Sequence, residues 1–243
     1  MHVPTLVAMT LEKMDEALPL FDRALQVARK DPALTDLRLL LLLNQAVTLS
    51  EVDRHDEAFA AAREVQHLAD RTGNVVRLTQ AHATLGRHLL ATGHWDDALV
   101  EVDVMPEDLK GASVRCSDQG VAAVICFHRG EAARARHHLQ AAAPYASRLE
   151  QRVVAWPYTL ARILDLEQTG ARAEALEVLA GVVDKDDADV APLLADTVRL
   201  AVEIGDAALA AATAARVKTF ADRSAIPHWD AAMPPAVCYS PPC

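Results

Sequence analysis

The chain has 243 residues, of which 51% are hydrophobic and only 4% aromatic, and its formal net charge is −10 at pH 7. This excess of negative charge would repel the phosphates of a nucleic acid, so we expect no direct nucleic acid partner. Runs of β-branched residues with period-two alternation are almost absent, which predicts an all-α fold.

Apolar periodicity, glycines and prolines divide the chain into helices. In chain order, we expect helices over 12–30, 36–52, 55–71, 75–92, 95–104, 117–129, 131–148, 150–169, 172–183, 190–204 and 207–223. The stretch between Met105 and Ser117 is the longest internal break, and we expect a kink or a short extra helix there. These elements form a repeat domain over 1–225, followed by a proline-rich C-terminal tail over 226–243 that cannot continue the helix.

The sequence has no segment typical of a membrane span or a signal peptide. The apolar run from Leu37 to Leu43 is far shorter than the roughly 20 residues that span a bilayer, so we expect no membrane partner. The N-terminus lacks the pattern of a signal peptide, and the four cysteines lack the paired spacing of a zinc site. We therefore expect a cytoplasmic protein without a metal or another cofactor.

A small residue recurs at near-regular intervals along the chain. The repeated alanines, at spacings of 41, 40, 37, 40 and 35 residues, are Ala17, Ala58, Ala98, Ala135, Ala175 and Ala210. A glycine lies five residues before four of them, and Glu12 and Asp53 take that place in the other two. Glycine ends a helix because it adopts the left-handed conformation cheaply, and a small side chain then lets the next helix pack closely. The pattern predicts antiparallel helical hairpins that stack into one core.

The clearest copy resembles a tetratricopeptide (TPR) repeat. The matching residues are Leu85, Gly86, Leu89, Gly93, Trp95 and Ala98. The resemblance covers roughly residues 11–222, with a period longer than the family's usual value of about 34. It implies a right-handed superhelix of antiparallel helical hairpins, a TPR-like α-solenoid, whose first helices line a concave face. An alanine-rich helical bundle is the alternative.

Two phrases and the longer period are similar to the helical-repeat region of large ATP-binding LuxR-type transcriptional regulators of actinobacteria. The phrases are FHRGEAARARHHLQAA over 127–142 and ADRSAIPH over 221–228. In that family the repeats serve as a sensor or interaction arm, so the resemblance implies a regulatory role. The sequence contains neither a Walker motif nor a helix-turn-helix after Pro227, so ATPase activity and DNA binding are not expected.

Motifs of catalysis are missing as well: the sequence contains no GxSxG elbow and no HExxH pair. We therefore expect no catalytic residue and a scaffold that binds a protein or peptide. The alternative is a protein that binds or sequesters a small-molecule effector on its concave face, and an enzyme with an unrecognised site is the third interpretation. An open groove with leucines favours the protein partner, whereas a deep pocket with converging arginines favours the small ligand.

Helix geometry and the family's orientation predict the concave face. The residues expected there are Leu40, Leu43, Val47, Gln80, Arg87, Val124, Phe127, Leu164, Glu167 and Arg199. An arginine on this face can hold a carboxylate through two hydrogen bonds. Alternatively, the apolar members simply fill the core between repeats. An uncapped apolar end around Met9, Leu11, Leu18 and Phe21 also predicts a homodimer.

Overall fold

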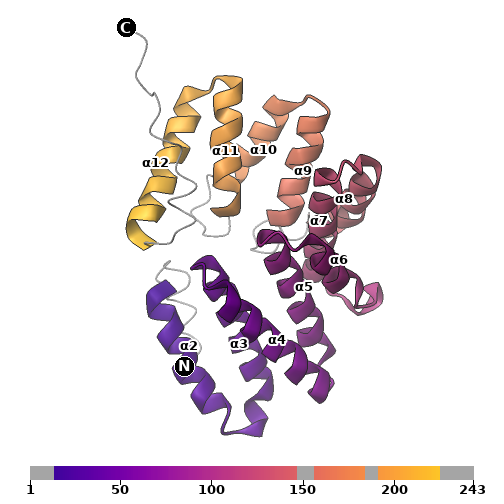
Figure 1. Ribbon diagram of the computed structural model, residues 1–243, viewed down its shortest axis with the longest axis vertical. Helices are drawn as coiled ribbons and strands as arrows, with labels where there is room; N and C mark the ends of the chain where they lie inside the picture. The colour runs from indigo at the N-terminus through magenta and orange to yellow at the C-terminus, as the bar shows by residue number, and fades with distance from the viewer. Residues whose placement is uncertain (1–13, 147–155, 184–190, 225–243) are drawn as a thin grey trace. The chain divides into compact units, whose positions relative to one another are not determined.

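The computed structural model describes residues 14–146, 156–183 and 191–224 (Figure 1). Within these residues the fold is all-helical, with eleven α-helices, two short 3₁₀-helices and no strand, which confirms the predicted all-α class. The predicted tail over 226–243 and the start of the helix expected over 150–169 lie outside the described residues. No described helix combines the length and the apolar character needed to cross a membrane.

The chain divides into two compact units, Met1–Asp165 and Leu166–Cys243, and the division falls within α9 (Trp156–Gln168). The other helices of the first unit are α2 (Met14–Ala28), η1 (Pro32–Leu34), α3 (Thr35–Glu51), α4 (His55–Thr72), α5 (Val75–Ala91), α6 (Trp95–Asp103), η2 (Glu107–Leu109), α7 (Ala112–His128) and α8 (Ala132–Ala146). Those of the second unit are α10 (Arg172–Val183), α11 (Ala191–Ile204) and α12 (Ala207–Ser224).

The predicted turns are present where the structure describes them. The residues in the turn position all have positive φ: Asp53 (58°), Gly93 (80°), Gly130 (76°), Gly170 (81°) and Gly205 (89°). After α5, for example, the backbone N–H of Gly93 donates to Leu90 (3.2 Å) and that of His94 donates to Leu89 (2.8 Å). These two bonds satisfy carbonyls that a helix end leaves without partners.

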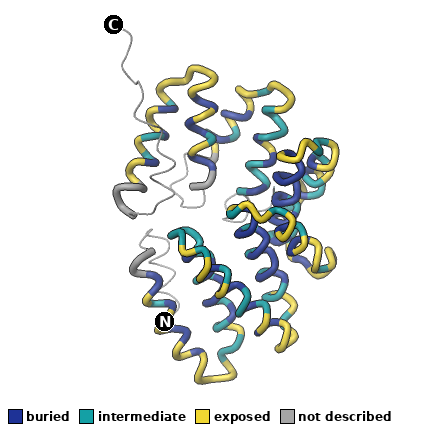
Figure 2. Tube along the Cα trace, in the orientation of Figure 1, coloured by how far each residue is buried: buried dark blue, intermediate teal, exposed yellow. Residues whose placement is uncertain are grey.

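The six repeated alanines are all buried, at 0% to 2% exposure. Figure 2 shows the same pattern along the chain, with buried stretches within the helices and exposed residues at many of the turns. In α6 the N–H of Ala98 donates to His94 (2.9 Å), which places the alanine one turn into its helix. The same bond recurs in α4, α8, α10 and α12. The repeat read from the sequence is therefore a repeat of core positions.

Helices of the first unit pack against both near and next-but-one neighbours. α3 contacts α4 and α5, and α5 contacts α6 and α7. Gly86 of α5 faces α6, because a Cβ at this position would lie 3.5 Å from Val102 Cγ2. A closer approach, which the sequence did not indicate, occurs at Gly120 of α7: a Cβ there would lie 2.5 Å from the backbone nitrogen of Tyr158. In the second unit, α11 contacts α10 and α12.

One predicted boundary is wrong. The helix expected over 117–129 begins at Ala112, so the break before it is shorter and contains η2, the short extra helix allowed by the sequence. Lys110 fixes this loop, since its buried ammonium group donates to the carbonyl of Val102 (2.7 Å) and lies 3.0 Å from Asp118. Once the loop is held there, helix formation begins directly after Gly111.

Candidate binding groove

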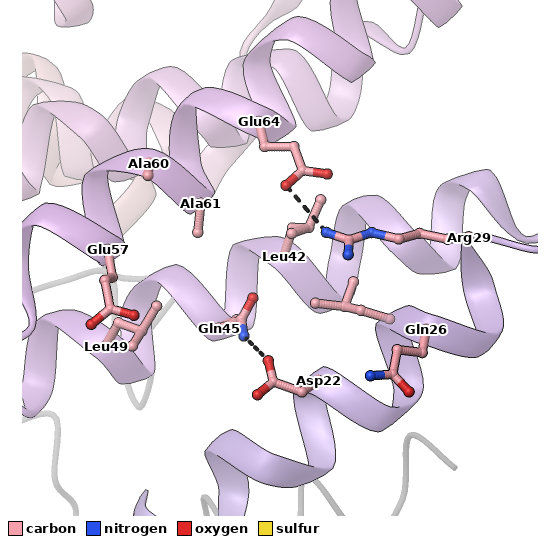
Figure 3. A pocket seen from close by; sticks show the side chains of 11 residues that line it. Asp22, Gln26, Arg29, Leu42, Gln45, Leu49, Glu57, Ala60, Ala61 and Glu64 are labelled. Atoms are coloured by element: carbon pink, nitrogen blue, oxygen red, sulfur yellow. Dashed lines mark hydrogen bonds and ion pairs between the residues drawn. The ribbon is translucent and has the colours of Figure 1, made fainter.

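A groove of about 400 Å³ runs between α2 and α4, across α3, in the first unit (Figure 3). Its floor is a stripe of α3 formed by Leu42, Gln45 and Leu49. Residues three and four apart lie on one face of a helix, which is why these three line up. One wall is formed by Asp22, Leu25 and Gln26 of α2 with Arg29 directly after it, and the other by Glu57, Ala60, Ala61 and Glu64 of α4.

The leucines that line the groove are well packed. Leu25 of the α2 wall and Leu42 and Leu49 of the floor are 3%, 2% and 5% exposed, respectively. Ala61 is 9% exposed and contributes only a methyl group to the α4 wall. The volume of the groove therefore depends on the small size of this side chain as well as on the spacing of the helices.

The rim is polar, and its charged groups are held in place. Asp22 accepts a hydrogen bond from the Gln45 amide (2.9 Å), and an Arg29 nitrogen lies 3.5 Å from a Glu64 oxygen, as Figure 3 shows. Two hydrogen bonds from Arg54 (2.7 and 2.6 Å) lower the pKa of Glu57 below its ordinary value. Glu64 also pairs with Arg38 of α3, so two of the three lining carboxylates, Glu57 and Glu64, are paired with arginines.

The corresponding place across α5 is occupied by a charged group of side chains. Glu101 of α6 lies 2.6 Å from His82 Nδ1 of α5 and 2.9 Å from an Arg63 nitrogen of α4. We call these three residues the brace. Burial disfavours the charged form of Glu101, but the hydrogen bond from His82 and the charge of Arg63 outweigh it, so its pKa lies below the ordinary value.

The brace and the groove occupy equivalent repeat positions. Glu101 lies three residues after a repeated alanine, and Ala61 has the same place in the preceding copy. His82 lies eleven residues before the turn residue Gly93, and Leu42 lies eleven before Asp53. Glu101 and His82 fill the space across α5, whereas Ala61 and Leu42 leave the space across α3 open.

Several residues predicted for the concave face lie in the core. Leu43, Val124 and Phe127 are 6%, 2% and 4% exposed and pack in the hydrophobic clusters of the first unit. The structure therefore places these three in core positions rather than on an accessible face. Leu40 and Val47 are partly buried, as is Leu164, which packs against the core cluster around α7.

The polar residues predicted for that face bind to other parts of the chain. Gln80 accepts a hydrogen bond from Arg77 (3.0 Å). Arg87 of α5 donates to Ser117 Oγ of α7 (3.0 Å) and to Thr84 Oγ1 (3.3 Å). These contacts give both side chains a structural role between or along neighbouring helices.

Glu167 and Arg199, both predicted for the same face, meet in the second unit. Arg199 donates two hydrogen bonds to the Glu167 carboxylate (2.7 and 2.9 Å) and also binds Asp196 (2.9 Å) and Glu203 (3.2 Å). The hydrogen bonds from Arg199 to Glu167 and Asp196 raise the pKa of the arginine despite its burial. Arg199 therefore makes its two hydrogen bonds to a carboxylate with Glu167 of the same chain.

None of the ten predicted residues lines the groove. The sequence feature that could have indicated the groove is the small Ala61 at the repeat position where the next copy has Glu101. It becomes visible only when the copies are compared position by position. Of the residues named for self-association, Leu18 and Phe21 are buried at 9% and 0%, while Met9 and Leu11 lie outside the described residues. Among the described residues, no three His, Cys, Asp or Glu side chains are grouped to hold a metal ion.

No protein-family model matches the chain, and no curated protein matches it either.

Proposed function

We propose that this protein is a non-catalytic, TPR-like helical scaffold that binds a segment of another protein in the groove between α2, α3 and α4. The observation that carries the proposal is the groove itself, with its leucine floor and polar rim. The TPR-like superhelix is supported by the buried alanine repeat, the glycine turns, and the packing of α3 on α5 and of α5 on α7.

A protein segment suits the groove better than a small molecule does. Small-molecule sites typically enclose about 70–90% of the ligand surface and direct a few polar groups inward. Here the groove is open to solvent, and its rim groups Asp22, Glu57 and Glu64 are engaged by Gln45, Arg54 and Arg29. Figure 3 shows the contacts of Asp22 with Gln45 and of Arg29 with Glu64. A helix or an extended peptide can lie along the groove between α2 and α4 while its backbone stays accessible.

The role we propose is regulatory: the scaffold acts as the interaction arm that its resemblance to LuxR-type regulators implies. Binding by such an arm requires a surface that is formed before the partner arrives, because ordering side chains on binding costs free energy. The fixed rim of the groove meets this requirement, since its carboxylates are already held by hydrogen bonds or ion pairs.

Site-specific photocrosslinking tests the proposal. A photoreactive amino acid replaces the exposed Gln26 inside the groove or, as a control, the exposed Val76, which does not line it. The full chain is irradiated in an extract of its native cells, and the crosslinked peptides are sequenced by mass spectrometry. We expect crosslinks from position 26 to fall on one segment of one protein and to disappear in the Ala61→Gln variant.

Two results would overturn the proposal. The first is a set of crosslinks from position 26 that scatter over unrelated proteins or persist when Ala61→Gln fills the groove. The second is a small molecule that copurifies with the chain and is lost in the same variant, which would assign the groove to an effector instead.

A further inference from the structure

We infer that Arg29 and Glu64 form a gate across the groove, and that the partner segment enters only when Arg29 turns away from Glu64. This inference rests on the proposed function and adds a control of access to the same site. It follows from the positions of the two side chains, from their unequal attachment to the fold and from the exposure of the arginine.

The two side chains of the gate approach each other from opposite sides of the groove. Arg29 lies directly after α2, and Glu64 lies in α4, the helix that forms the other wall. Both residues line the groove, and Figure 3 shows the guanidinium group and the carboxylate facing each other. An occupant that extends along the groove past this point must therefore displace their contact.

The other contacts at the rim do not join the two walls. Asp22 of α2 accepts its hydrogen bond from Gln45 of the floor (2.9 Å). Glu57 of α4 accepts two hydrogen bonds from Arg54, which directly precedes the same helix. Among the hydrogen bonds and ion pairs that the structure describes for the lining residues, the gate alone connects the α2 side to the α4 side.

Glu64 is the fixed half of the gate. Its Oε1 accepts a hydrogen bond of 2.5 Å from Arg38 of α3, whose side chain is only 25% exposed. Its Oε2 lies 3.5 Å from an Arg29 nitrogen, beyond the range of about 2.7–3.2 Å that is usual for an N–H···O hydrogen bond. The carboxylate therefore stays in place on Arg38 when Arg29 moves.

Arg29 is the movable half of the gate. Its side chain is 50% exposed, and the residue lies in the turn between α2 and η1 rather than within a helix. An exposed ion pair is weak, because water reduces its attraction and holding a long side chain costs entropy. Arg29 can therefore leave Glu64 easily, and the closed gate should lower the affinity of an occupant by about three-fold, since only the open fraction of molecules binds.

Access to the groove can be measured without a partner, through the thiol of an Ala61→Cys variant. Ala61 lines the groove one helical turn before Glu64, and the full chain also carries Cys238→Ser and Cys243→Ser. The rate of reaction with the neutral reagent dithiodipyridine is followed by absorbance. We expect Arg29→Met to raise this rate by about three-fold, because the gate then no longer covers the thiol.

A matched control separates access from charge. Arg23→Met removes the same charge from an exposed residue of α2 that does not line the groove, and we expect it to leave the reaction rate unchanged. Loss of a nearby arginine disfavours the reactive thiolate, so a faster reaction in Arg29→Met reports access rather than electrostatics. Each variant is first checked for unchanged helicity and urea midpoint.

Peptides selected on the full chain from a random phage-displayed library test the gate with an occupant. The probe is a synthetic peptide of the consensus sequence that loses binding to Ala61→Gln. It should bind Arg29→Met about three-fold more tightly than the wild type. Glu64→Gln should give the same increase and the double variant no more, since either change opens the gate. Raising the salt from about 50 to about 500 mM should bring the wild type close to Arg29→Met, because salt screens an exposed ion pair.

The outcomes distinguish the gate from the scaffold. If the peptide depends on Ala61 but binds Arg29→Met no more tightly than the wild type, the gate is wrong and the scaffold proposal stands. A thiol reaction rate that Arg29→Met leaves unchanged also overturns the gate. If no selected peptide depends on Ala61, the scaffold proposal falls, and the control of its access falls with it.

Discussion

The groove across α3 and the brace across α5 show two outcomes at equivalent places in successive repeats. Where α6 carries Glu101, the space is closed by its buried hydrogen bond with His82 and its ion pair with Arg63. Where α4 carries Ala61, over Leu42, a groove of about 400 Å³ remains. Whether such a space is open or filled therefore depends on side-chain size and polarity at a few positions of the repeat.

The two spaces also differ in what their stability requires. Buried leucines such as Leu42 stabilise the helices without hydrogen-bond partners, whereas a buried carboxylate such as Glu101 must keep its hydrogen bonds. Glu101 is 7% exposed and depends on His82 and Arg63. The space across α3 thus stays open, while the space across α5 is filled by side chains that bind each other.

The largest expected effect comes from removing the centre of the brace. Glu101→Ala leaves the buried His82 without its carboxylate, and we expect a loss of about 3 kcal/mol in the free energy of unfolding, measured with urea at pH 7. Adding His82→Leu reproduces the pair found across α3 and removes the unpaired ring. The double variant should therefore lose less than the sum of the two single losses, and strict additivity would contradict the coupling.

A smaller effect is expected from removing only the charge of Glu101, and it should depend on pH. Glu101→Gln should cost about 2 kcal/mol at pH 7. Because the folded-state pKa of Glu101 lies below its ordinary value of 4.5, its stabilising contribution is present above pH 4.5 and is lost as the pH falls through the lower folded value. The stability gap between wild type and variant should therefore close in acid, whereas the exposed Glu177→Gln control should show no such closure.

The turns offer a third comparison, between an aspartate and a glycine in the same left-handed position. Gly93→Ala should lower stability by about 1–2 kcal/mol, because its φ of 80° is unfavourable for a residue with a Cβ. Gly93→Asp should cost less, since Asp53 adopts φ 58° at the equivalent turn. Thermal unfolding followed by circular dichroism ranks the two variants, and the reverse order would show that Asp53 is tolerated for another reason.

The smallest effect concerns Gly86, which stands where the preceding copy has Ala46. A Cβ at Gly86 would make ordinary contacts, 3.5 Å from Val102 and 3.7 Å from the Ala98 carbonyl. Gly86→Ala should therefore be neutral or raise stability by up to about 1 kcal/mol through helix propensity. Gly120→Ala should lower stability instead, because its Cβ would lie 2.5 Å from the Tyr158 nitrogen; equal urea midpoints for the two variants would contradict this contrast.

The helices and turns were predictable because they depend on local chemistry. The recurring alanines and glycines indicated which positions would be buried and which would have positive φ, and the structure confirms both where it describes them. The predicted start of α7 was wrong. Lys110 binds the Val102 carbonyl and lies beside Asp118 in the loop before this helix, and the composition and spacing of the sequence do not reveal these contacts.

The candidate groove was harder to predict than the helices, for a reason visible in Val124 and Phe127. Helical spacing indicates that these residues share a face, but a helix packed on several sides has more than one buried face, and these two lie in the core. Glu167 and Arg199, both predicted for the concave face, are close enough in the structure to bind each other.

The sequence by itself determined the helical class, the hairpin turns and the repeated core positions, because propensity, turn geometry and small-residue spacing act over a few neighbouring residues. Only the tertiary structure decided which spaces between helices stay open and which polar side chains are already engaged. Those properties depend on distances between residues from three different helices, such as Asp22, Leu42 and Ala61, and packing brings them together only in the folded chain.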